Sequence, residues 1–94
     1  MKTIKLKFGT LTRLAGNPYG RKTYKEQIED KIDFNDQTKI VFPETINGIS
    51  ISFIQGLMDE PVKLLGSKKE FEKKIILYSP IEKVQKKIDE SIWF

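Results

Sequence analysis

The residue types that could do chemistry are concentrated in two short polar segments. The first is a glycine-containing turn with two bases, Gly16-Asn17-Pro18-Tyr19-Gly20-Arg21-Lys22. It differs from a phosphate-binding P-loop, because three residues separate its glycines where that motif has four, and because Arg21 precedes the lysine. The free N–H groups and the dipole of a helix start still favour an anion there. The segment therefore predicts a contact surface at Asn17, Tyr19 and Arg21, and it does not predict nucleotide hydrolysis.

The second segment holds Ser50 and Ser52, followed by Gln55. A serine nucleophile needs a general base, and the chain has no histidine and no cysteine. No lysine follows a serine at the Ser-x-x-Lys spacing either. We therefore interpret the two serines as caps of a helix and as partner contacts, and we expect no catalytic residue and no enzyme activity.

The acidic residues do not predict a metal site. Asp30, Asp33 and Asp36 recur every third position without the glycine and the terminal glutamate of a calcium loop. A solvated acidic turn explains them, so we expect neither metal nor cofactor.

Basic residues are concentrated at the start of the chain. Residues 1–22 contain no acid and six bases, which are Lys2, Lys5, Lys7, Arg13, Arg21 and Lys22. One interpretation is an edge strand that lysines protect from aggregation. The other is a surface for phosphate or nucleic acid.

Three segments have the pattern of strands. Ile4, Leu6 and Phe8 alternate with lysines, as in a half-buried strand. Residues 39–42 form an apolar run that Pro43 ends, and residues 72–78 form the third strand.

Three helices are expected between and after these strands. After a turn-rich loop at residues 9–20, Tyr24, Ile28 and Ile32 recur every four residues over about three turns. A second, broadly apolar helix follows Ser50 and ends near Gly66, with Gly56 and Pro61 weakening or kinking it. Ser79-Pro80-Ile81-Glu82 predicts a capping box at the start of the third helix.

The predicted order β-α-β-α-β-α indicates a single α/β domain over residues 1–94, a small sheet of three to four strands with parallel neighbours and helices packed on it. The absence of cysteine favours a reducing compartment. No stretch of about 18 apolar residues and no signal-peptide pattern occurs, so we expect a cytoplasmic protein without a membrane partner.

Three segments are similar to the motifs of a known family. Gly16-Asn17-Pro18-Tyr19-Gly20, leading to Tyr24, is similar to an Asp-Gly-Pro-Tyr-Ser-Gly entry to a first helix. Residues 46–57 are similar to a small-residue turn, Ser-Ser-Phe and the helix that follows. Residues 75–80 are similar to a last strand with a Ser-Pro helix start. On these residues the stretch 16–94 resembles the STAS-like family, short bacterial domains of largely unassigned function that are related in fold to anti-sigma-factor antagonists.

The resemblance implies a regulatory role without catalysis. It implies docking on a GHKL-type, histidine-kinase-like ATPase, and phosphorylation of a serine at the start of the second helix, which corresponds to Ser52 or its neighbour Ser50. A phosphate there would add about −1.5 to −2 charges and change docking. The chain departs from the family's pattern with Ile51 in place of a small polar residue and Phe53 in place of glycine.

The leading hypothesis is thus a protein-interaction module that uses the loops at residues 16–22 and 45–53. Two adjacent helix starts would form its contact surface. The alternatives are a phosphate- or nucleic-acid-binding accessory protein, which would use the basic first third of the chain, and a small phage-encoded inhibitor.

Overall fold

A computed structural model describes residues 1–92, and Trp93 and Phe94, whose role the sequence leaves open, lie outside the described residues. Its main sheet consists of three parallel strands, β1 (Lys2–Lys5), β3 (Thr38–Val41) and β5 (Ile75–Tyr78), in the order β1-β3-β5. Ile4, Ile40 and Leu77 lie side by side across the strands and are buried. The expected parallel α/β sheet is confirmed at this level.

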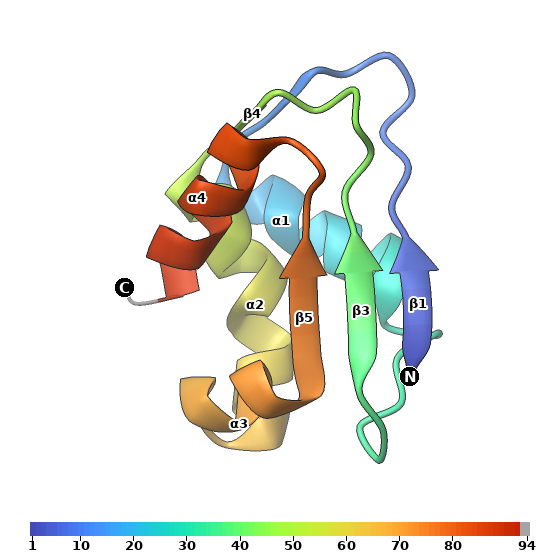
Figure 1. Ribbon diagram of the computed structural model, residues 1–94. Helices are drawn as coiled ribbons and strands as arrows, with labels where there is room; N and C mark the ends of the chain where they lie inside the picture. Colours follow the sequence, from blue (N-terminus) through green and yellow to red (C-terminus); the bar gives the residue numbers. More distant parts are fainter. Residues whose placement is uncertain (93–94) are drawn as a thin grey trace.

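Two helices cover one face of this sheet (Figure 1). They are α1 (Asn17–Thr23), which continues directly as the π-helical turn η1 (Tyr24–Ile28), and α2 (Ile51–Leu65). Two further helices flank α2, namely α3 (Lys68–Lys74) and α4 (Glu82–Ile92). The core lies between the sheet and α1, η1 and α2, and Phe42, Phe53 and Ile54 are fully buried in it.

A second, two-stranded sheet joins the loops that leave β1 and β3. It pairs β2 (Arg13–Leu14) with β4 (Gly48–Ile49) in parallel, directly before α1 and α2 begin. The sequence does not predict these strands, because two residues are too few for a period-two pattern to stand out from a loop. Their pairing brings the two loops together.

The first helix begins earlier than expected. Residues 17–20 are helical and not part of a loop, because Gly16 turns the chain with φ of 91° and Pro18 fits the first turn of a helix. The regular spacing of Tyr24 and Ile28 is that of a helix, but the helix ends at Ile28, and Ile32 packs against the core from the segment that follows.

The third strand is shorter than predicted. It begins at Ile75, because residues 68–74 form α3, where Ser67 accepts a hydrogen bond from the Glu70 N–H at 3.1 Å. Phe71 is the one buried residue of α3, so the segment lacks the alternation of a strand. The prediction of a strand over residues 72–74 was wrong.

The predicted helix ends differ in how well they are confirmed. Ser50 caps α2 by accepting from the Phe53 N–H at 3.1 Å, and Gly66 ends it with φ of 98°, while the helix runs unbroken through Gly56 and Pro61. At α4 the Ser79 side chain accepts from the Ile81 N–H, but the Ser79 N–H donates to Gln85 Oε1 at 2.7 Å. Because α4 begins at Glu82, Pro80 and Glu82 do not occupy its first and third positions, and the prediction of a Ser79–Glu82 capping box was wrong.

A side chain from η1 occupies backbone hydrogen-bonding groups on the free edge of the chain that continues β1. Beyond the strand, the Lys7 N–H donates to Gln27 Oε1 and Gln27 Nε2 donates to the Lys7 carbonyl, both at 2.8 Å. An amide paired in this way with a peptide group occupies the edge that another chain could otherwise extend. The interpretation of this segment as an edge strand is confirmed by its place in the sheet.

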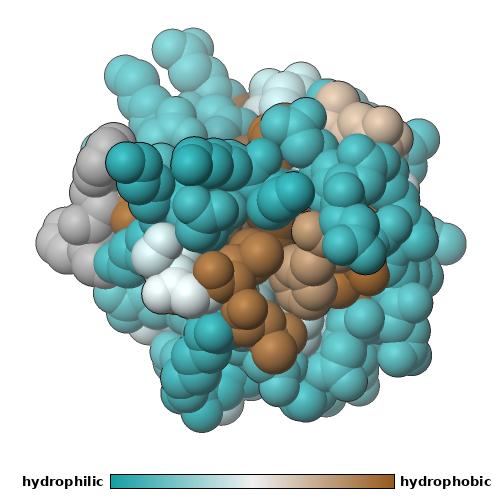
Figure 2. Space-filling model, turned by 90° about the horizontal axis from the view of Figure 1, so that it is seen from below, coloured by the Kyte–Doolittle hydropathy of each residue, from teal (hydrophilic) through white to brown (hydrophobic). Residues whose placement is uncertain are grey.

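The lower end of the molecule carries a small apolar patch. Figure 2 shows apolar side chains gathered near its centre with hydrophilic ones around them. At this end Leu64, in the last turn of α2, is 64% exposed, and Leu65, Ile32 and Phe34 are partly buried against the core.

Candidate functional site

The two predicted loops meet, as the hypothesis of adjacent helix starts requires. The Gly16 N–H donates to Ser50 Oγ at 3.3 Å, and the Ser50 N–H donates to the Leu14 carbonyl at 2.9 Å. The axes of α1 and α2 then diverge from this corner (Figure 1). The two helix starts are therefore neighbours, but they do not form one parallel pair.

The fold uses most of the polar groups at this corner. Ser50 Oγ accepts from the N–H groups of both Gly16 and Phe53 and lies 3.0 Å from Ser52 Oγ. Both serines are half-buried. Ser50 thus holds the two loops together, while the Ser52 hydroxyl contacts only that of Ser50 among the described side chains.

The predicted contacts from α1 are likewise engaged inside the molecule. The Tyr19 ring packs edge-on against Phe53 and Phe8, at 5.6 and 6.2 Å between ring centroids. The backbone of Asn17 lies so close to Gly56 that a methyl group on this glycine would overlap with the Asn17 carbonyl. Tyr19 and Asn17 therefore secure the packing of α1 on α2.

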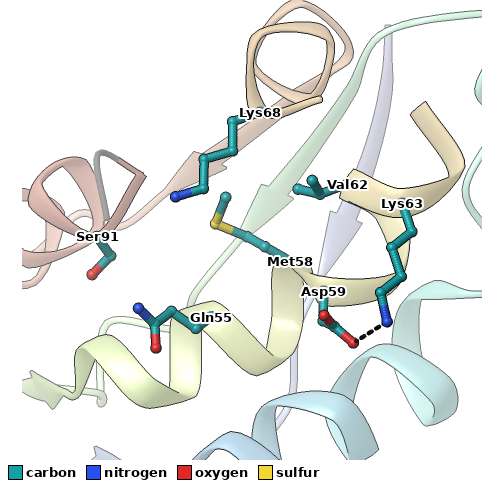
Figure 3. A pocket seen from close by; sticks show the side chains of 7 residues that line it. All are labelled: Gln55, Met58, Asp59, Val62, Lys63, Lys68 and Ser91. Carbon is teal, nitrogen blue, oxygen red and sulfur yellow. Dashed lines mark hydrogen bonds and ion pairs between the residues drawn. The ribbon is translucent and has the colours of Figure 1, made fainter. Parts of the chain in front are cut away.

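Arg21 and Gln55 lie on different grooves of the α2 surface. Arg21 pairs with Asp59 at 3.5 Å, beside the crossing with α1. Gln55 lines a groove of about 340 Å³ between α2, α3 and α4, together with Met58, Val62 and Ser91 (Figure 3). Asp59 borders both grooves and also pairs with Lys63 at 3.4 Å. The six predicted contact residues are thus near one another without forming one surface.

A charged network joins η1 to α2. Lys25 Nζ lies 2.8 Å from Glu29 and 3.1 Å from Glu60, and the hydrogen bonds that Lys25 donates to these carboxylates raise its pKa. The hydrogen bond from Lys25 in turn lowers the pKa of Glu29. Burial, followed by the charge of Glu60, raises the pKa of Tyr24. Lys25 thus joins two carboxylates and links η1 to α2, while Glu60 Oε2 is buried without a hydrogen-bond partner among the described residues.

The outer face of the main sheet is uncovered. The strands place six residues there in two rows, Thr3–Lys39–Ile76 and Lys5–Val41–Tyr78. Ile76 and Tyr78 are 38% and 39% exposed, although both are large and apolar or aromatic. Figure 1 shows no helix in front of these strands, while α1 and α2 lie behind them. Parallel sheets are normally covered on both faces, so this face is an unusual feature of the fold.

A basic cleft of about 400 Å³ lies between β4 and α4. Its lining includes four cations and a single carboxylate, namely Arg13, Lys83, Lys86, Lys87 and Glu90. Of the six bases in residues 1–22, Arg13 alone lies in this cleft. Lys5 lies on the open sheet face and Arg21 on α1, so these bases do not form one cluster.

Comparison of the chain with protein families, with curated proteins and with solved structures finds no match. The resemblance to the STAS-like family therefore stays a prediction. Within residues 1–92, no group of three or more acidic side chains is arranged to hold a metal ion. Over the same residues, no helix has both the length and the apolar character that crossing a membrane requires.

The open face and the cleft were both missed by the sequence interpretation. Residues 75–78 are an unbroken apolar run, which is typical of a strand buried on both faces. No local pattern links Lys83, Lys86 and Lys87 to Arg13, about seventy positions earlier in the chain. The alternation of Lys39 with Ile40, like that of Lys5 with Ile4, was the available signal for a sheet that is half exposed.

Proposed function

We propose that this chain is a non-enzymatic interaction domain that binds another protein through the open face of the β1-β3-β5 sheet. The observation that carries the proposal is the uncovered parallel sheet, on which Ile76 and Tyr78 of the edge strand β5 are exposed. Burying such side chains contributes about 25 cal/mol of binding free energy per Å² of apolar area. Tyrosine is enriched among the interface residues that contribute most to binding energy.

The charge of this face defines the chemistry of the partner. Among its six residues are two lysines, Lys5 and Lys39, and no acid. Lys39 Nζ lies over the Tyr78 ring, 4.3 Å from its centroid, which holds both side chains in place before binding. A partner that places apolar side chains against β5 and acidic side chains against Lys39 of β3 and Lys5 of β1 complements this arrangement. A second copy of the same face does not, because it would place lysines near lysines.

The same module could instead use the corner of the two helix starts, as the resemblance to anti-sigma-factor antagonists implies. In that case a histidine-kinase-like ATPase would contact Ser52, and a phosphate on this serine would repel it. We favour the sheet face, because Ser50, Asn17 and Tyr19 are already engaged within the fold.

The test compares two exposed apolar residues on different sides of the molecule. A tagged chain carrying Ile76→Glu is expected to lose the proteins that the wild type retains from the native host, because the charge would be buried against the partner. Leu64→Glu, at the apolar patch of the lower end, is the matched control and is expected to retain them. Both variants should melt within a few degrees of the wild type.

The outcome also separates the two surfaces. If Ile76→Glu retains the same proteins as the wild type, the sheet face is not the binding surface. If Ser52→Asp loses them while Ser52→Ala and Ile76→Glu do not, the corner of the two helix starts is the surface.

A further inference from the structure

The basic cleft between β4 and α4 lies apart from the open sheet face and has chemistry of its own. Arg13 reaches it from β2, and Lys83, Lys86 and Lys87 reach it from α4. These residues are about seventy positions apart in the sequence, and the β2–β4 pairing brings them together. Asn47 and Gly48 complete the side of the cleft opposite the lysines.

Arg13 lies against the backbone of Gly48. A methyl group added to Gly48 would be 3.1 Å from both Cζ and Nη1 of Arg13, which is closer than ordinary contact distance. Within the described residues, the Arg13 side chain forms no ion pair and no hydrogen bond. The chain's second arginine, Arg21, pairs with Asp59. Glycine at position 48 thus leaves room for a guanidinium whose donors face the cleft.

Two of the three lysines of α4, Lys83 and Lys87, are placed unfavourably for the helix alone. Lys83 and Lys87 are four positions apart, a spacing at which like charges repel. Lys83 also lies in the first turn, where the helix dipole disfavours a cation. Among the ion pairs of residues 1–92, none involves these lysines. Val84 and Ile88 anchor the helix from its buried side, so the lysines are held in place without partners of their own.

We propose that this cleft is a binding site for phosphate groups. A guanidinium offers two parallel N–H donors to two phosphate oxygens, and the lysines supply point charges around them. Bound phosphate would relieve the repulsion between Lys83 and Lys87. The terminal phosphates of a nucleotide and the backbone of a nucleic acid share this chemistry, and the experiment below distinguishes them.

The test measures binding of three probes at low ionic strength by calorimetry and by amide chemical shifts. The probes are inorganic pyrophosphate, adenosine triphosphate and a short oligothymidylate. We expect shifts at Arg13, Gly48 and residues 83–87. Arg13→Ala should lower affinity about tenfold, the loss typical of one charge-assisted hydrogen bond. Arg21→Ala removes the same charge elsewhere and should change affinity less than about twofold.

Gly48→Ala is a second variant that leaves the net charge unchanged. The backbone of Gly48 is not in the left-handed region, so alanine should be accepted once the flexible end of Arg13 moves away. We expect a folded protein with weakened binding. A thermal melt close to that of the wild type shows that lost binding is not lost folding.

The source of the phosphate follows from the salt dependence. Tighter binding of the oligonucleotide, with a log–log salt slope that falls by about one in Arg13→Ala, indicates a nucleic-acid backbone. Tighter binding of the triphosphate or pyrophosphate indicates a small ligand. Either result supports the site. Equal losses of affinity in Arg13→Ala and Arg21→Ala would show that binding depends only on net charge, and this would overturn the proposal. The absence of binding to all three probes would also overturn it.

Discussion

The two faces of the β1-β3-β5 sheet differ in whether their side chains have partners within the fold. On the inner face, α1 and α2 cross with backbone against backbone, and Arg21, Lys25 and Glu29 each have a charged partner. On the outer face, Ile76 and Tyr78 are exposed, and no acid accompanies the lysines among the strand residues there. The side chains on the inner face therefore contribute to stability, whereas those on the outer face are free to contact a partner.

The strongest test of this difference is the helix crossing on the inner face. A methyl group on Gly56 would overlap with the Asn17 carbonyl, and one on Gly20 with the Phe53 carbonyl, so α1 would have to move away from α2. Gly56→Ala is therefore expected to destabilise the protein by about 3 kcal/mol or more, or to prevent folding. Urea denaturation measures this. Gln55→Ala, exposed on the same helix, should change stability by less than about 0.5 kcal/mol. Similar stabilities of the two variants would contradict the close crossing.

A single strand allows the two faces to be compared directly. Leu77 points to the core with 5% exposure, and its neighbour Ile76 points outward with 38%. Leu77→Ala should cost about 2–5 kcal/mol, because it removes buried methyl groups and leaves a cavity. Ile76→Ala should cost less than about 1 kcal/mol. If the two substitutions cost the same, the outer face is covered in solution, and binding should be examined in the assembled state.

The corner of the two helix starts should give an intermediate effect. Ser50→Ala removes the acceptor of the Phe53 and Gly16 N–H groups and is expected to lower stability by about 1–2 kcal/mol. Ser52→Ala removes a hydroxyl bonded only to Ser50 and should cost less than about 0.5 kcal/mol. Thermal and chemical denaturation of both variants provide the measurement. A larger loss in Ser52→Ala would reverse the assigned roles.

The smallest effect is expected from the pH dependence of the inner face. Burial raises the pKa of Tyr24 above its ordinary value of 10.0. The folded protein thus binds this proton more tightly than the unfolded chain, so the contribution is complete below pH 10.0 and is lost as the pH rises further. Between about pH 9 and 11, the urea midpoint of the wild type should fall more than that of Tyr24→Phe. Parallel curves would show that Tyr24 is not protected by the fold.

Local signals in the sequence predicted features that depend on neighbouring residues. Ser50 as a helix cap, Gly66 as a helix end and the alternating burial of Ile4, Leu6 and Phe8 are of this kind. The extent of α1 and of β5 was less well predicted. Pro18 is compatible with both a turn and a first helical turn, and residues 72–74 belong to a helix that Ser67 begins. In each case two local structures fit the same residues, and packing decided between them.

The sequence by itself determined the α/β class, most of the buried residues and the absence of histidine and cysteine chemistry. These follow from residue types and from periods of two and of about four, which one segment carries alone. Only the tertiary structure decided that one sheet face stays open and that Arg13 joins the lysines of α4. Both depend on which helix covers which strand and on contacts between distant residues. The lysines that alternate with Ile4 and Ile40 indicate a half-exposed sheet, but they do not show that Ile76 and Tyr78 lie on its open face.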